Sequence, residues 1–132
     1  MKNKKRQVIT SIVVLIAVAI VLSMGSVSAD ISEDVLKVSA TLSARSEISL
    51  EDITDVKLLD SLESGRRSFG VETMKIMGGT FTNNQFGKYK LYCYKKINKY
   101  IVVYSTDKIV CFNLDSEEET ENFYNEIIHS IS

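Results

Sequence analysis

The sequence has no proline and no tryptophan, and it has only one histidine and two cysteines among 132 residues. The absence of proline excludes proline-rich linkers, and the absence of tryptophan removes an aromatic that is enriched in protein interfaces. The single histidine, His129, cannot form a histidine cluster for a metal, and no serine stands in a Gly-x-Ser-x-Gly context. We therefore expect a protein that is not an enzyme, with no catalytic residues, no metal site and no cofactor.

Charge is unevenly distributed along the chain. Four of the 16 basic residues and none of the 17 acidic residues precede residue 30, so the remainder carries a formal charge of about −5. A mildly acidic surface argues against nucleic acid as a partner and against electrostatic capture by anionic lipid.

The N-terminal segment is the most informative part of the sequence. A cluster of cations precedes a long apolar run that begins at Val8. The cations are Lys2, Lys4, Lys5 and Arg6. Because cations stay on the cytoplasmic side, the pattern predicts a single-pass membrane protein that crosses through residues 7–28, with its C-terminal domain outside. The alternative is a signal peptide cleaved after Ala29, which would release a secreted, soluble domain.

These features divide the chain into three expected parts. Residues 1–29 form the membrane anchor or signal segment, residues 30–35 a short polar tether, and residues 36–132 one folded domain. About 100 residues are enough for a single small hydrophobic core.

The remaining pattern is mostly that of β-strands. Alternating apolar and polar residues predict about seven strands. They are expected at residues 35–42, 53–59, 66–71, 74–81, 88–95, 100–105 and 108–113. Ser116 followed by Glu119 is a capping-box signature, and Phe123 and Ile127 begin an apolar helical face. The predicted fold is therefore mainly β with one C-terminal α-helix, preceded by an N-terminal transmembrane or signal helix.

The two cysteines fall on the first and third strands of a predicted three-stranded meander over residues 88–113. Strands two apart in a sheet are separated by about 9.6 Å, whereas a disulfide requires Cα atoms within about 7 Å. We therefore predict that Cys93 and Cys111 are free, buried thiols.

Several stretches resemble the bacterial PH-like (pleckstrin-homology-like) domain family, in which such domains follow membrane segments. The matching stretches are Ile48-Ser-Leu-Glu-Asp-Ile53, Val56-Lys-Leu-Leu-Asp60, Gly65-Arg-Arg-Ser-Phe-Gly70, Gly79-Thr-Phe, Gly87-Lys-Tyr-Lys-Leu-Tyr92, Tyr100-Ile-Val-Val and Cys111-Phe-Asn. The resemblance implies a small PH-like barrel of about seven antiparallel strands that binds a lipid, a peptide or a protein. The loop after Leu42 offers Arg45 alone, which argues against a phosphoinositide ligand.

Two pairs of residues are candidate ligand-binding residues. Arg66 and Arg67 follow a Ser-Gly turn, where they either grip a carboxylate, a phosphate or an anionic polymer, or pair with a neighbouring carboxylate to fix the loop. Tyr92 and Tyr94 share a strand face that is either a solvated surface or a peptide-binding face. The expected function is that of a membrane-tethered, extracytoplasmic and non-catalytic binding module with a protein or peptide partner. The alternative is a secreted domain that binds an envelope polymer or a small molecule.

Overall fold

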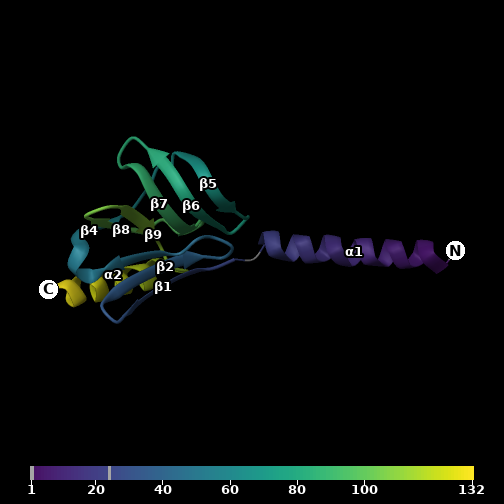
Figure 1. Ribbon diagram of the computed structural model, residues 1–132, viewed down its shortest axis with the longest axis horizontal. Helices are drawn as coiled ribbons and strands as arrows, with labels where there is room; N and C mark the ends of the chain where they lie inside the picture. Colours follow the sequence, from purple (N-terminus) through teal and green to yellow (C-terminus); the bar gives the residue numbers. More distant parts are fainter. Residues whose placement is uncertain (1, 24) are drawn as a thin grey trace.

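In the computed structural model, which describes residues 2–23 and 25–132, a long N-terminal helix projects from a β-rich body (Figure 1). Helix α1 spans Lys2–Ser23, and its apolar side chains from Val8 to Ile16 are exposed. Over the described residues, no helix is both long and apolar enough to cross a membrane. The predicted transmembrane helix is therefore not supported. Residues 1 and 24, the second of which falls inside the predicted membrane segment 7–28, lie outside the described part.

The body consists of two sheets that are not closed into a barrel, which corrects the barrel expected from the resemblance. The described residues form nine strands instead of about seven. They are β1 Val27–Ser32, β2 Val35–Ala40, β3 Ser46–Ser49, β4 Ile53–Leu59, β5 Arg66–Glu72, β6 Ile76–Asn83, β7 Gly87–Tyr94, β8 Tyr100–Ser105 and β9 Ile109–Phe112. A short 3-10 turn, η1 Leu50–Asp52, precedes β4, and helix α2 spans Glu117–Ile131. A mainly β fold with a C-terminal helix is confirmed.

The smaller sheet has the order β1-β2-β3 and begins earlier than the sequence suggests. Strand β1 pairs with β2 from Val27 opposite Ala40 to Ser32 opposite Val35. Residues 30–35, expected as a tether, therefore lie in this hairpin. Glu33 and Asp34 make its turn with positive φ angles, a conformation that hairpin turns require.

The larger sheet has the order β4-β8-β9-β7-β6-β5, and this order contradicts the predicted antiparallel meander. Strand β9 lies between β8 and β7, and it runs parallel to β7, with Leu91 opposite Cys111. The connection of residues 95–99 is long enough to pass over the inserted strand, because each extended residue spans about 3.3 Å. Cys93 and Cys111 are free and buried, as predicted, but they lie on neighbouring strands, so the predicted separation was wrong.

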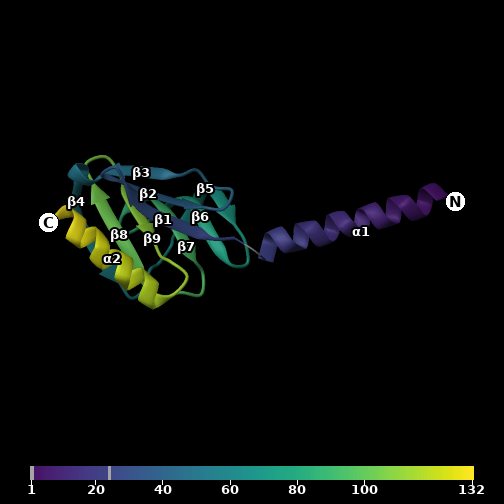
Figure 2. The same ribbon diagram turned by 90° about the horizontal axis from the view of Figure 1, so that it is seen from below.

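Two hydrophobic clusters cover the two faces of the larger sheet. One fills the space between the sheets and α2, where Phe112 and Phe123 meet edge to face with ring centroids 5.8 Å apart. Helix α2 packs against β4 and β8 of the larger sheet (Figure 2). The second cluster contains both cysteines and Tyr89, whose hydroxyl donates to the Ser64 carbonyl at 2.6 Å. This bond holds the connection between β4 and β5 over the second face.

Candidate functional site

The predicted arginines lie on β5, the strand at one edge of the larger sheet. Within the described part of the chain, β5 pairs only with β6, and all of its residues except Val71 are exposed. Arg67 Nη1 lies 3.7 Å from Glu72 Oε1, whereas Arg66 takes part in no ion pair of the described residues. The two arginines therefore differ: the Arg67 guanidinium contacts a carboxylate on its own strand, and the Arg66 side chain is exposed to solvent.

Glu72 links this edge to the next strands. Lys95 Nζ lies 2.7 Å from Glu72 Oε2, whereas Arg67 contacts the other carboxylate oxygen. The hydrogen bond from Lys95 and the charges of Lys95 and Arg67 lower the pKa of the Glu72 carboxyl, against a smaller opposing effect of burial. Glu72 is thus ionised at neutral pH and holds Arg67 and Lys95 on either side.

Two glycines bring β5 and β6 unusually close together at the middle of the edge. Gly70 and Gly79 are opposite each other and have φ angles of +137° and +149°. A Cβ at Gly70 would lie 2.2 Å from the Gly78 carbonyl oxygen, and a Cβ at Gly79 would lie 2.2 Å from the Phe69 carbonyl oxygen. A register shift between Arg67 and Phe69 precedes this close approach. The Gly78-Gly79 pair therefore permits a close strand pairing next to this bulge.

Beside this edge, a hollow of about 140 Å³ opens between β5 and the loop that joins β2 to β3. Its rim carries Phe69 and Leu42, whose side chains are 75% and 74% exposed. Leu42 has φ +61°, a conformation that a branched side chain rarely adopts. Lys90 lines the floor and donates to Thr80 Oγ1 at 2.6 Å. The hollow combines an apolar rim with a cationic, hydrogen-bonded floor.

The two tyrosines are structural, which differs from either predicted role for their strand face. Tyr92 is 1% exposed; its hydroxyl donates to the Ala44 carbonyl at 2.7 Å and lies 2.6 Å from Ser46 Oγ. Tyr94 is also buried, and its hydroxyl accepts the Val27 N–H at 3.0 Å. Each ring therefore joins the larger sheet to the smaller one. Burial raises the pKa of the Tyr92 hydroxyl, so it stays protonated and able to donate.

The structure does not bring the four candidate residues together. The arginines lie on the β5 edge, Tyr92 lines the small hollow beside that edge, and Tyr94 lines a different hollow near the β5–β6 turn. Sequence reasoning missed Phe69 and Leu42. The only local signal for Phe69 is its place between Arg67 and Gly70, and Leu42 has none, because exposure at a loop is decided by the packing around it.

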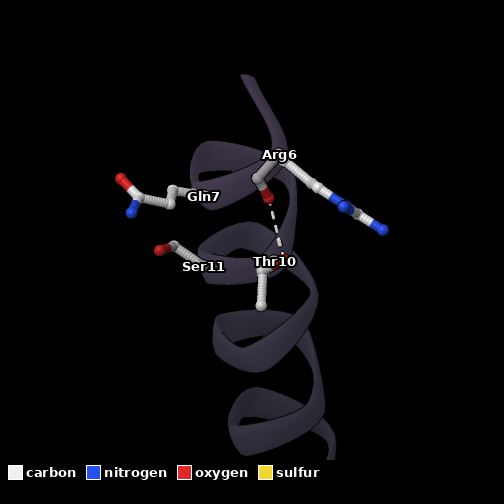
Figure 3. Close-up of a pocket in the computed structure, with 4 residues that line it drawn as sticks. All are labelled: Arg6, Gln7, Thr10 and Ser11. Atoms are coloured by element: carbon white, nitrogen blue, oxygen red, sulfur yellow. Dashed lines mark hydrogen bonds between the residues drawn. The ribbon is translucent and has the colours of Figure 1, made fainter. Parts of the chain in front are cut away.

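A third hollow, of about 570 Å³, runs along α1 and is lined by Arg6, Gln7, Thr10 and Ser11 (Figure 3). All four residues belong to one helix, so the hollow has no opposing wall among the described residues and cannot enclose a ligand. The Thr10 hydroxyl donates to the Arg6 carbonyl at 2.8 Å. This polar group is therefore satisfied within the helix itself.

Comparison with known proteins identifies the body. A model of the bacterial PH domain family matches residues 27–128, which cover both sheets and nearly all of α2. The chain belongs to the bacterial PH domain family. No curated protein and no solved structure matches it. The match begins at Val27, so this bacterial PH domain includes β1 and begins nine residues before residue 36, the expected start of the folded domain.

Proposed function

We propose that this bacterial PH domain is a non-catalytic binding module whose partner is an extended, acidic peptide segment bound along the β5 edge. The observation that carries the proposal is the edge itself: a strand exposed from Arg66 to Gly70, with an apolar hollow beside it. An exposed edge offers unpaired backbone donors and acceptors to an added strand.

The side chains along the edge suggest the chemistry of such a partner. Arg66 and Arg67 suit carboxylates, because the guanidinium fork binds them through two hydrogen bonds. Phe69 and Leu42 form a rim where one apolar side chain of the peptide can be buried. Large exposed apolar side chains grouped in one place are typical of interaction surfaces.

We further propose that the N-terminal segment is retained and holds the domain at the outer face of a bacterial membrane. Many apolar side chains of α1 are exposed, and contact with water is unfavourable for such a surface. Cleavage after Ala29 would remove the first half of β1, including the buried Val27 that donates to Tyr94. This observation argues against the secreted alternative.

The cost of such cleavage is a testable prediction. We expect a chain that begins at Asp30 to be less stable than one that begins at Gly25 by about 2–4 kcal/mol, because it lacks the buried Val27 and its hydrogen bond. Urea unfolding followed by circular dichroism measures the difference. Equal stability of the two chains, or a native N-terminus at Asp30 in mass spectrometry, would contradict retention.

The peptide site is tested by photo-crosslinking from position 69 of the full chain in cells. We expect a photoreactive phenylalanine analogue there to give discrete protein adducts, and the same analogue at exposed Asn84 to give none of them. Replacing Arg66 and Arg67 with alanine should lower the adduct yield at least about tenfold, since charge-assisted hydrogen bonds are lost. Because the Arg67–Glu72 pair is exposed, the free energy of unfolding should change by less than about 1 kcal/mol.

The matched control removes two cations elsewhere, by Lys37→Ala with Lys57→Ala. It should leave the adducts at position 69 unchanged. A melting temperature that collapses in the arginine variant would mean that the arginines are structural. Adducts that are the same from positions 69 and 84 would mean that the β5 edge is not the site.

A further inference from the structure

One end of the domain is defined by the point where α1 joins it. Gly25 lies against Ile76 and Thr73, so that a Cβ on it would come within 2.9 Å of the Ile76 side chain. The Ser26 carbonyl accepts the Thr41 N–H at 3.0 Å, and Val27 is held by Tyr94. In both views the β5–β6 turn lies at this end, beside the C-terminal end of α1 (Figures 1 and 2).

A hollow of about 600 Å³ opens at the same end, formed by three connections that the arginine site does not use. They are the β5–β6 turn, the β7–β8 connection and the β9–α2 connection. Met74, Ile97 and the Tyr94 ring supply its apolar lining, while Lys75 and Lys96 supply its cations. Met74 is 75% exposed although it is large and apolar.

The charges of this hollow favour an anion that also has an apolar part. Lys75 and Lys96 are exposed and take part in no ion pair of the described residues, and Lys75 Nζ lies 5.6 Å from the centre of the Tyr94 ring. Asp115 is the one carboxylate in the lining. Two mobile ammonium groups around an apolar floor suit a phosphate joined to a hydrocarbon chain.

The opposite end of the domain is acidic. Its turns carry a group of exposed carboxylates. They are Glu33, Asp34, Glu51, Asp52 and Asp107. These turns are neighbours, because the Leu50 N–H donates to the Asp34 carbonyl and the Thr106 N–H donates to the Asp52 carbonyl. Strand β8 runs from the lysine end to this acidic end. Lys75 and Lys96 form a local pair of cations at one end of a domain whose net charge is acidic.

We infer that the residues around the Met74 hollow contact the surface of the membrane to which α1 attaches the domain. In this orientation Lys75 and Lys96 bind the headgroup phosphates of anionic lipids. The inference rests on the proposed membrane attachment through α1. Continuity with α1 gives the direction in which the domain faces, and it places the acidic turns of the opposite end away from the lipid. Met74 enters the boundary between headgroups and acyl chains, as exposed apolar side chains do at membrane surfaces.

Site-specific fluorescence on the full chain in lipid vesicles tests this orientation. Cys93 and Cys111 are buried, and burial raises the pKa of the Cys93 thiol to about 12, so a thiol-reactive dye will label an introduced cysteine selectively. The variant Met74→Cys places the dye at the proposed docking end. Asp107→Cys places it at the acidic end, and Val13→Cys places it on helix α1. The vesicles contain phosphatidylcholine alone or with about one-third phosphatidylglycerol, and nitroxide-labelled lipid is the quencher.

We expect lipid quenching at positions 13 and 74 and none at 107, with more quenching at 74 when phosphatidylglycerol is present. Each of Lys75→Gln and Lys96→Gln should lower the docking equilibrium constant about fivefold in these vesicles. Asp115→Asn should raise it, and Lys57→Gln, the matched control for lost charge, should leave it unchanged.

Two other outcomes separate the inference from its premise. Quenching at position 13 with equal, low quenching at 74 and 107 would overturn the docking end and leave the attachment through α1 intact. Absence of quenching at position 13 would overturn the attachment and the docking together. Quenching at 74 that does not respond to phosphatidylglycerol or to the lysine substitutions would overturn the role of Lys75 and Lys96.

Discussion

Replacing Asn113 with leucine is expected to destabilise the domain by about 3–5 kcal/mol, a large part of the stability of a domain of this size. Asn113 is fully buried at the end of β9. Its Oδ1 accepts the Tyr94 N–H at 2.7 Å, and its Nδ2 donates to the Tyr94 and Ile97 carbonyls at 3.3 and 3.0 Å. Leucine has a similar volume but no polar group, so three backbone groups would lose their partners.

Urea unfolding of the variant measures this loss, and exposed Asn98→Leu is the control for the same chemical change. The control should alter the free energy of unfolding by less than about 0.5 kcal/mol. A loss below 1 kcal/mol for Asn113→Leu would mean that the backbone groups find other partners. Because Asn113 holds the β7–β8 connection that carries Lys96, the variant should also reduce docking at the Met74 hollow.

Alanine at Gly70 or Gly79 is expected to separate β5 from β6. The added Cβ would lie 2.2 Å from a backbone carbonyl oxygen in each case, and both φ angles are positive. We expect a loss of about 2–4 kcal/mol, expressed mainly as unpairing of β5, because this strand buries little of its surface.

Hydrogen exchange of the β5 amides measures the unpairing. Gly87→Ala is the control: it has φ +70° and no atom within 4 Å of the new Cβ, so it tests the backbone conformation without the clash. It should cost about 1 kcal/mol and leave β5 protected. The glycine variants should also abolish the adducts from position 69, since the proposed peptide site needs β5 in place. Protected β5 amides in Gly70→Ala would show that the sheet can adjust.

Local signals in the sequence predicted several elements with their ends. The strands expected at residues 53–59 and 100–105 agree with β4 and β8, and Ser116 caps α2 by accepting the Glu119 N–H at 3.0 Å. Strand alternation and helix capping involve residues within a few positions of each other, so their pattern is visible along the chain.

Two elements were hidden because their sequences favour another interpretation. Residues 27–29 continue an apolar segment and end in small residues, so they suggest a cleavage site, yet they form the first half of β1. No strand was expected at residues 46–49, yet they form β3. Both strands depend on pairing with β2, which supplies hydrogen bonds that no local pattern reveals.

The exposed arginines of the candidate site could be predicted, and the tyrosines could not. A charged pair after a Ser-Gly turn is expected at the surface because burying it is costly. Tyr92 and Tyr94 fit a surface or a core equally well, since each has an apolar ring and a polar tip. Only the smaller sheet, packed over them, places their hydroxyls against Ala44, Ser46 and Val27.

By itself, the sequence determined the class of this protein: a basic and apolar N-terminal segment, a mainly β body and a capped terminal helix. Tertiary structure alone decided the insertion of β9 between β7 and β8, the exposure of Phe69, Leu42 and Met74, and the placement of Lys75 and Lys96 around one hollow. Local patterns depend on neighbours in the chain, whereas strand order and surface charge depend on residues that are distant in sequence and meet only in the folded state.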